Sequence, residues 1–145
     1  MKASKEAIRI IKKYEGFRSK AYLCPAGVWT IGYGFTQGVK PGDVMTQGLA
    51  EQRLSTEIEI RAKELYQLLH TRGIVVGQNQ FDALLSFAYN VGLNAFKKST
   101  MLKCLMSKDL AGAAVQFDRW VYGPNKVKLR GLIARRSEEK QLFLS

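Results

Sequence analysis

The chain has 145 residues, of which 46% are hydrophobic and 24% charged, and a formal net charge of +11. This length and composition suit one globular domain with a proper core, and they exclude a disordered chain. No apolar run reaches transmembrane length, and the first residues carry scattered charges, so neither membrane insertion nor a secretory signal is expected.

The positive charge favours a polyanionic partner, but charge alone does not choose between nucleic acid, an anionic membrane surface and an acidic cell-wall polymer. The two cysteines, Cys24 and Cys104, are far apart, and His70 is the single histidine. These residues fit neither a disulfide framework nor a zinc site, so no metal and no cofactor are expected.

The first expected helix begins after Ser4, which can cap it, and ends before Gly16. Apolar residues recur in it at helical spacing, at Ala7, Ile8, Ile11 and Tyr14. Glu15 therefore lies in the last turn of this helix.

A hairpin is expected from residue 21 to residue 35, because strand-forming residues flank a turn at Pro25-Ala26-Gly27. Gly32 and Gly34 would let its second strand bend or approach another backbone closely. A further turn is expected at residues 41–43, after a short third strand.

The remainder reads as helical. Helices are expected from Thr46 to about Leu69, over residues 80–92, from Ser99 to Met106, from Asp109 to near Trp120, and over residues 129–143. The predicted fold is α+β, one domain over residues 1–145. Its small lobe spans about 14–48, a spine helix about 47–69, and a helical lobe about 70–145 together with the N-terminal helix.

Glu15 is a candidate general acid. The C-terminal end of a helix carries partial negative charge, which disfavours an ionised carboxylate and favours one that can donate a proton. Thr30, on the returning strand, could orient a water molecule by hydrogen bonding. Taken singly, a helix-end glutamate paired with an arginine and a small buried Cys24 are the commoner interpretations.

The spacing of Glu15, Cys24 and Thr30 resembles the motif of a known family. Glu15, eight residues, Cys24, five residues and Thr30, within EGFRSKAYLCPAGVWTIGYGFT, resemble the active-site signature of the phage-type lysozymes, the endolysins of glycoside hydrolase family 24. SFAYNVG, FKKST and RWVYGPNKVKLRGLIARR are similar to further motifs of that family, so the resemblance covers nearly the whole chain. It implies the lysozyme-like α+β fold with a cleft between two lobes.

The resemblance also implies roles for individual residues. Glu15 would be the general acid, Cys24 would occupy the position of the second carboxylate, Thr30 would order water, and Arg136 would be the arginine that faces the acid. Such an arginine favours the ionised form of Glu15 and opposes the helix end, and the sequence leaves that balance open. Four residues fall at positions similar to sugar-contacting or cleft-lining ones: Tyr89, Asn90, Ser99 and Gln116.

Two positions depart from the family pattern. Phe35 stands where the family often has histidine, and Cys24 stands where it has aspartate or cysteine. A thiol cannot serve as a permanently charged stabiliser. It could act as a thiolate, as a neutral group that orients water, or as a nucleophile, so an inverting and a retaining outcome both remain open.

The implied function is a muramidase that hydrolyses the β-1,4 bond between N-acetylmuramic acid and N-acetylglucosamine in bacterial peptidoglycan and so lyses a host cell. We expect a monomer that binds no nucleic acid. It would be made in the host cytoplasm and reach the wall only after a separate protein permeabilises the membrane.

Two alternatives belong to other classes. In the first, the chain is a basic nucleic-acid-binding protein whose RGLIARR cluster contacts phosphates. In the second, it is a cysteine peptidase or amidase that uses Cys24 and His70. The first predicts salt-dependent binding and no wall activity, and the second predicts new amino termini in wall digests where the muramidase would give new reducing sugar ends.

Overall fold

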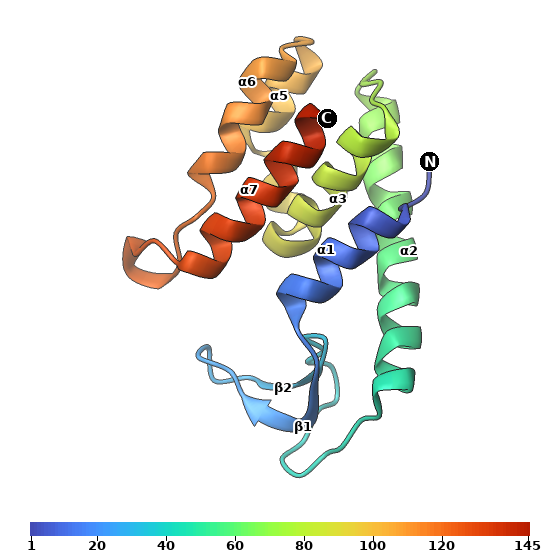
Figure 1. Ribbon diagram of the computed structural model, residues 1–145, viewed down its shortest axis with the longest axis vertical. Coiled ribbons are helices and arrows are strands. Elements are labelled where there is room, and N and C mark those ends of the chain that lie inside the picture. The colour runs from blue at the N-terminus through green and yellow to red at the C-terminus, as the bar shows by residue number, and fades with distance from the viewer.

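The computed structural model describes residues 1–145, and its elements confirm the predicted α+β class. In chain order they are α1 (Lys5–Glu15), β1 (Arg18–Leu23), β2 (Trp29–Gly32), α2 (Gln47–Thr71), α3 (Gln78–Val91), α4 (Leu93–Lys97), α5 (Thr100–Met106), α6 (Leu110–Gln116), two 3₁₀ turns, η1 (Phe117–Arg119) and η2 (Pro124–Lys126), and α7 (Arg130–Leu144). Figure 1 shows the two-stranded sheet at one end of the molecule, the other helices gathered at the opposite end, and α2 running between them.

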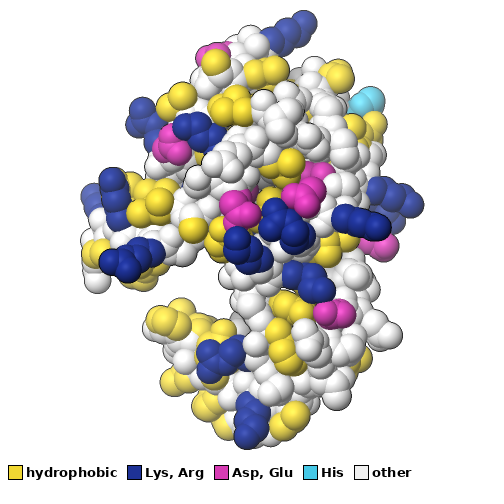
Figure 2. Space-filling model, viewed as in Figure 1, with side chains coloured by type: hydrophobic (Ala, Val, Ile, Leu, Met, Phe, Trp, Pro, Cys, Tyr) yellow, Lys and Arg dark blue, Asp and Glu magenta, His cyan; other side chains and the backbone are white.

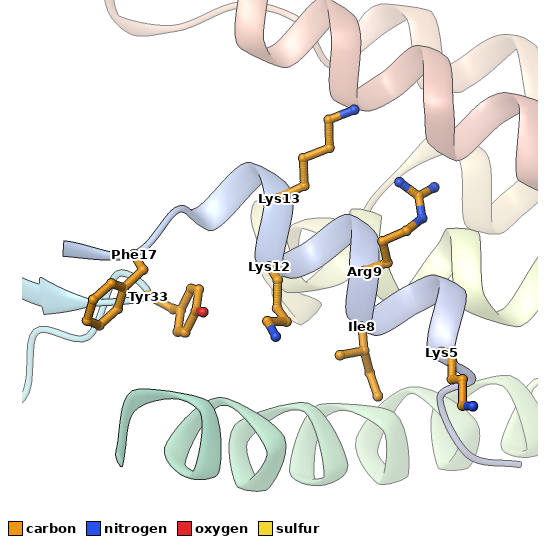
Figure 3. A pocket seen from close by; sticks show the side chains of 7 residues that line it. All are labelled: Lys5, Ile8, Arg9, Lys12, Lys13, Phe17 and Tyr33. Atoms are coloured by element: carbon orange, nitrogen blue, oxygen red, sulfur yellow. The ribbon is translucent and has the colours of Figure 1, made fainter. Parts of the chain in front are cut away.

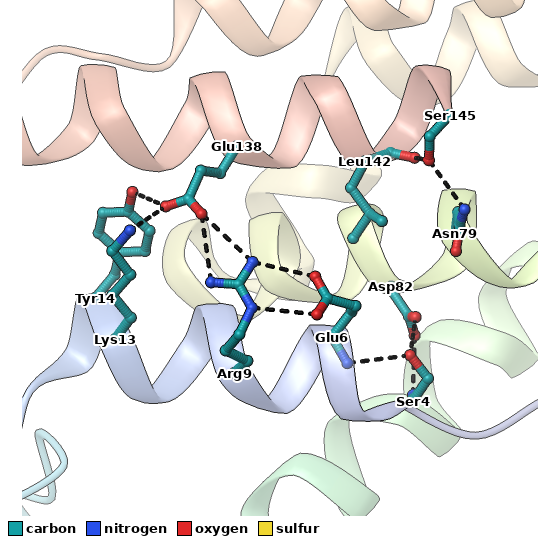
Figure 4. A network of polar contacts seen from close by, with 10 residues as sticks. All are labelled: Ser4, Glu6, Arg9, Lys13, Tyr14, Asn79, Asp82, Glu138, Leu142 and Ser145. Carbon is teal, nitrogen blue, oxygen red and sulfur yellow. Dashed lines mark hydrogen bonds and ion pairs between the residues drawn. The ribbon is translucent and has the colours of Figure 1, made fainter.

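The first helix is anchored at its start and stopped where the sequence predicts. The Ser4 hydroxyl accepts a hydrogen bond from the backbone N–H of Glu6, and the Ser4 backbone N–H donates to Oδ1 of Asp82 on α3 at 3.0 Å (Figure 4). Asp82 is fully buried. Gly16 ends the helix with φ +69°, a conformation that glycine adopts without strain. The start and end of α1 therefore fix where Glu15 emerges.

The hairpin is shorter in its second strand and longer in its first than expected. The strands are antiparallel, with Tyr22 opposite Thr30, and β1 begins at Arg18. The third strand expected before residues 41–43 is wrong: residues 36–40 form no strand, and Val44, beyond the turn, makes only an isolated bridge with Lys20. Pro41, which lacks an N–H, and the left-handed glycines at 38 and 42 interrupt any longer ladder there.

Helix α3 is the centre of the core. Every side chain from Phe81 to Ala88 is buried, and the helix packs most extensively against α7. The Phe87 ring meets the rings of Phe117 and Trp120 edge to face, at 5.5 and 5.4 Å between centroids. The core thus holds α7 against α3. None of the helices combines the length and the apolar character that crossing a membrane requires.

The remaining helix boundaries differ slightly from expectation. Helix α2 continues to Thr71, two residues beyond the predicted end, and α4 was not expected. The helix capped by Asp109 was expected to reach Trp120 but ends at Gln116. The next three residues, Phe117–Arg119, form the separate 3₁₀ turn η1. A tightened final turn is a common way for a helix to end.

Candidate active site

Glu15 lies where the chain passes from the helices to the sheet. Its Oε2 accepts a hydrogen bond of 2.8 Å from Nη1 of Arg135 on α7. The Glu15 side chain is 20% exposed, whereas that of Arg135 is 3% exposed. The space-filling view shows a deep notch between the helical part and the sheet part, on the side where Figure 1 places the turn of the hairpin and the loop before α7 (Figure 2). The acid is therefore held by a buried cation yet reachable from solvent.

The arginine that faces the acid is Arg135, so the expectation for Arg136 is wrong. Arg136 donates from Nη2 to Oδ1 of Asn90 at 2.9 Å, and its Nε lies 2.7 Å from Oε1 of Glu139. Consecutive residues on a helix point about 100° apart, so only one of two adjacent arginines can reach Glu15. The sequence shows the pair but not the rotation of α7.

Glu15 lines a cavity of ≈ 310 Å³ with residues from α2, α3 and the loop after β2. Its lining is Glu15, Tyr33, Gly34, Phe35, Thr36, Gln37, Arg53, Glu57, Arg61 and Tyr89. Charged and hydroxyl-bearing side chains make up most of this lining, and they can form hydrogen bonds to a sugar.

Tyr89 is the expected sugar-contacting residue that the structure does bring to Glu15. Burial, followed by the charges of Glu15 and Glu57, raises the pKa of the Tyr89 hydroxyl to about 12. The hydroxyl therefore stays protonated across the ordinary pH range and is available to donate a hydrogen bond.

Cys24 and Thr30 lie together in the hairpin, but neither lines the Glu15 cavity. Thr30 is buried, and its hydroxyl donates to the Val28 carbonyl at 3.0 Å. Cys24 is a free, partly exposed thiol. The pKa of the Cys24 thiol is lowered, chiefly by a hydrogen bond from the backbone of Val28, with smaller contributions from Ala26 and the Thr30 hydroxyl. The hairpin turn thus makes this thiol more acidic than an ordinary cysteine.

The three other expected substrate residues lie outside this cavity. Asn90 is occupied by its contact with Arg136. Ser99 is buried and caps α5, with its hydroxyl donating to the Phe96 carbonyl at 2.7 Å and accepting from the Leu102 N–H at 3.1 Å. Gln116, half-buried, is the last residue of α6. The structure thus gives Asn90 a contact with α7 and Ser99 a capping role.

Three charged residues of α2 line the cavity but were not predicted from the sequence as site residues. Arg53, Glu57 and Arg61 all line the Glu15 cavity. Arg53 stacks on the Phe35 ring at 4.3 Å, and Arg61 lies 4.0 Å from Glu57. Their spacing of four residues places them on one face of the helix, a signal that was present in the sequence.

A larger cavity, of ≈ 530 Å³, lies along α1 and is lined by Lys5, Ile8, Arg9, Lys12, Lys13, Phe17 and Tyr33 (Figure 3). It has no carboxylate to act as an acid. Three of its cations already have anionic partners: Arg9 and Lys13 pair with Glu138, and Lys12 pairs with Glu51. The smaller cavity around Glu15 is therefore the better candidate site.

The structure opposes both alternative functions. Helix α2 has 25 residues, so it spans roughly 37 Å. His70 lies near its C-terminal end, stacked on Tyr66, while the hairpin that carries Cys24 lies at the opposite end (Figure 1). A Cys24–His70 pair cannot form. In the RGLIARR cluster, Arg135 and Arg136 are buried and paired with carboxylates, so they offer no phosphate-binding surface.

The fold and the site define a lysozyme-class glycoside hydrolase, and comparison with known proteins agrees. The family model described as phage lysozyme matches residues 12–139. The chain is 43% identical to the endolysin of Acyrthosiphon pisum secondary endosymbiont phage 1, over 100% of this chain and 99% of that protein. It is 40% identical to the endolysin of Bacillus phage PZA, of whose length it spans 56%.

A solved structure is similar over its full length as well. The muramidase domain of SpmX from Asticaccaulis excentricus is 35% identical, with a TM-score of 0.89, over 99% of this chain and 98% of that one. The chain belongs to the phage lysozyme family.

Proposed function

We propose that the chain hydrolyses the β-1,4 bond between N-acetylmuramic acid and N-acetylglucosamine in peptidoglycan, with Glu15 as the general acid. The observation that carries the proposal is the placement of Glu15: a carboxyl at a helix end, open to a polar cavity and held from behind by Arg135. The membership of the family and the muramidase neighbour support the same reaction.

In this mechanism Glu15 gives its proton to the leaving glycosidic oxygen as the bond breaks. Arg135 fixes the carboxyl through Oε2, so Oε1 is the oxygen left to face the substrate. The Tyr89 hydroxyl, which stays protonated, donates a hydrogen bond to the bound sugar. Burial of this site strengthens each of these interactions relative to bulk water.

Cys24 and Thr30, which lie outside the cavity around Glu15, would act on the attacking water. The lowered pKa of the Cys24 thiol supports a thiolate that accepts a hydrogen bond from the attacking water, with the Thr30 hydroxyl helping to orient that water. Cys24 follows β1 and Thr30 lies in β2, so the two residues flank the turn of one hairpin. The proposal takes water as the nucleophile, and hence inversion, over attack by the thiol itself.

The whole chain, residues 1–145, would be one catalytic domain, with a small lobe over about 14–48, a spine over about 47–69 and a helical lobe that includes α1. It would act as a monomer in host-cell lysis. Its net charge of +11 favours the anionic wall. The proposal places its synthesis in the host cytoplasm and makes its access to the wall depend on a separate membrane-permeabilising protein.

The test is digestion of purified peptidoglycan by the wild-type chain and by Glu15→Gln. We expect the wild-type chain to release new N-acetylmuramic acid reducing ends, and the variant to lose at least a hundredfold of that rate while its circular dichroism is unchanged. New amino termini in place of new reducing ends, or undiminished lysis by the variant, would sink the assignment. The anomer first released reports the stereochemistry.

A further inference from the structure

Glu139 is a fully buried carboxylate that the catalytic step does not use. It lies on α7, one turn beyond Arg135 and Arg136, and its exposed fraction is 0%. Its Oε2 accepts from Arg135 Nε and from Arg136 Nη2, each at 3.2 Å, and from the Ser86 hydroxyl at 2.5 Å. Burial raises the pKa of the Glu139 carboxyl, while Arg136, Ser86 and Arg135 oppose that rise. Contacts with two guanidinium groups fit an ionised carboxylate.

Glu139 and Ser86 hold Arg135 from behind. Arg135 Nε contacts Glu139 and the Ser86 hydroxyl, and Nη2 donates to the Ser86 carbonyl at 3.1 Å. Only Nη1 points forward, to Glu15. The planar guanidinium therefore has its orientation set by α3 and α7 before it reaches the acid.

The charges in this cluster balance. Arg135 and Arg136 are each at most 2% exposed, and they share Glu139 as an anionic partner. Glu15 is the other carboxylate in contact with Arg135. Two cations thus face two anions, and without Glu139 the carboxylate of Glu15 would be alone with two buried positive charges.

We propose that Glu139 is a positioning residue for the catalytic acid: it orients Arg135 against Glu15 and offsets one of the two arginine charges, so that Glu15 can still carry the proton it must donate. This inference rests on the proposed role of Glu15. Burial also lowers the pKa of the Arg136 guanidinium, and the charge of Glu139 opposes that fall.

Other charged and titratable groups face Glu15, and none replaces Glu139. They are Tyr33 after β2, Arg53, Glu57 and Arg61 on α2, and Tyr89 on α3. The α2 group contributes two cations and one anion, more exposed than the α7 cluster and open to solvent screening. Glu139 itself is faced from α3 by Ser86 and from α7 by the two arginines.

The experiment compares the pH dependence of peptidoglycan hydrolysis in charge-altered variants. Glu139→Gln keeps the shape of the side chain but removes its charge, so Glu15 holds its proton more weakly, and the alkaline limb should move down by about one pH unit. Arg136→Gln should move the limb upward by a similar amount. The double variant Glu139→Gln/Arg136→Gln restores the balance, so its limb should return to the wild-type pH.

Glu138→Gln is the matched control, because it removes the same charge from the adjacent residue. Glu138 is partly exposed and contacts Lys13, Tyr14 and Arg9 instead of Arg135 (Figure 4). Its limb should stay in place. The double variant removes both partners of a buried pair, which proteins tolerate better than the loss of one. It and Arg136→Gln therefore keep the test decisive if Glu139→Gln does not fold.

The outcomes separate this inference from the proposed function. Limbs that stay at the wild-type pH, or that shift in the same direction in both single variants, overturn the role of Glu139 while Glu15→Gln stays inactive. Full activity of Glu15→Gln overturns the proposed function instead. Opposite shifts that cancel in the double variant support the charge balance, which loss of packing alone would not produce.

Discussion

Gly34 lies against the Glu15 carboxyl. A Cβ at position 34 would stand 3.1 Å from Glu15 Oε1, the oxygen that Arg135 leaves free. The residue also has φ +82°, a region that glycine occupies without strain. The bend after β2 therefore brings bare backbone to the proposed catalytic acid.

Gly34→Ala should lower activity by more than its effect on stability explains. The methyl group pushes on Oε1, and the backbone strain costs about 1 kcal/mol. Gly38→Ala is the matched control, because Gly38 has φ +70° but no atom within 4 Å of its Cβ position. Both variants should lose similar stability in urea unfolding, and only Gly34→Ala should lose most of its hydrolysis rate. Equal rates in the two variants would contradict a steric role for Gly34.

The two adjacent arginines of α7 should differ in catalysis. Arg135→Lys keeps the charge but loses the planar fork that binds Glu15, Glu139 and Ser86 together, so kcat/KM should fall roughly tenfold or more. Arg136→Lys loses contacts of similar burial but does not touch Glu15, so it should retain most activity. Turbidity assays, with thermal unfolding to normalise for stability, measure the difference. A larger loss in Arg136→Lys would show that the pairing with Glu15 is wrong.

Cys24 should react faster with iodoacetamide than Cys104. The lowered pKa of the Cys24 thiol gives more thiolate near neutral pH. As the pH rises, the rate of Cys24 alkylation should therefore start to level off at a lower pH than for an ordinary thiol, whose pKa is 9.0. Mass spectrometry of peptides across a pH series measures both sites in one sample. If the thiolate takes part in catalysis, inactivation should follow the alkylation of Cys24, Cys24→Ala should lose most activity, and Cys24→Asp should keep much of it. Full activity in the alanine variant would reduce Cys24 to packing.

Glu138 should contribute stability that is lost in acid. Burial raises the pKa of its carboxyl, but hydrogen bonds from Lys13 and Tyr14 and the charges of Lys13 and Arg9 outweigh burial and lower it below the ordinary 4.5. A depressed carboxyl pKa stabilises the fold above the unfolded value and stops doing so as pH falls through the folded one.

The free energy of unfolding of Glu138→Gln should therefore lie below that of the wild-type chain at pH 7, and the gap should close as the pH drops below 4.5. Urea unfolding at a series of pH values measures it. Lys13→Met removes only one partner of Glu138. Its loss of stability relative to the wild-type chain should therefore depend less on pH than that of Glu138→Gln. A gap that stays constant into acid would mean that Glu138 acts by packing alone.

The sequence predicts most of the helices because their signals are local. Ser4, Thr46, Ser99 and Asp109 all cap helices as expected, since a capping side chain needs only its own next residues. The prediction of a short third strand is wrong because a strand needs a partner strand to pair with. The glycines on either side of Pro41 turn the chain away from such a partner. The family and the fold class follow from sequence motifs, which do not depend on the exact bounds of a strand.

The candidate site was less predictable because it depends on how elements rotate against each other. The sequence placed Glu15 at a helix end, but the choice between Arg135 and Arg136 follows from the docking of α7 on α3. Tyr89 lines the same cavity as Glu15, whereas the Ser99 hydroxyl caps α5 by accepting a hydrogen bond from Leu102. Such outcomes depend on tertiary packing, which no spacing of residues along one element records.

The pairing of Glu15 with Arg135 joins residues that are 120 positions apart. During synthesis the acid leaves the ribosome long before the arginine that holds it, and α7 must dock on α3 before that contact exists. Glu139 and Arg136 arrive with the same helix. The nascent chain therefore carries Glu15 without the partner that positions it, and the proposed catalytic centre is complete only when this late helix folds into place.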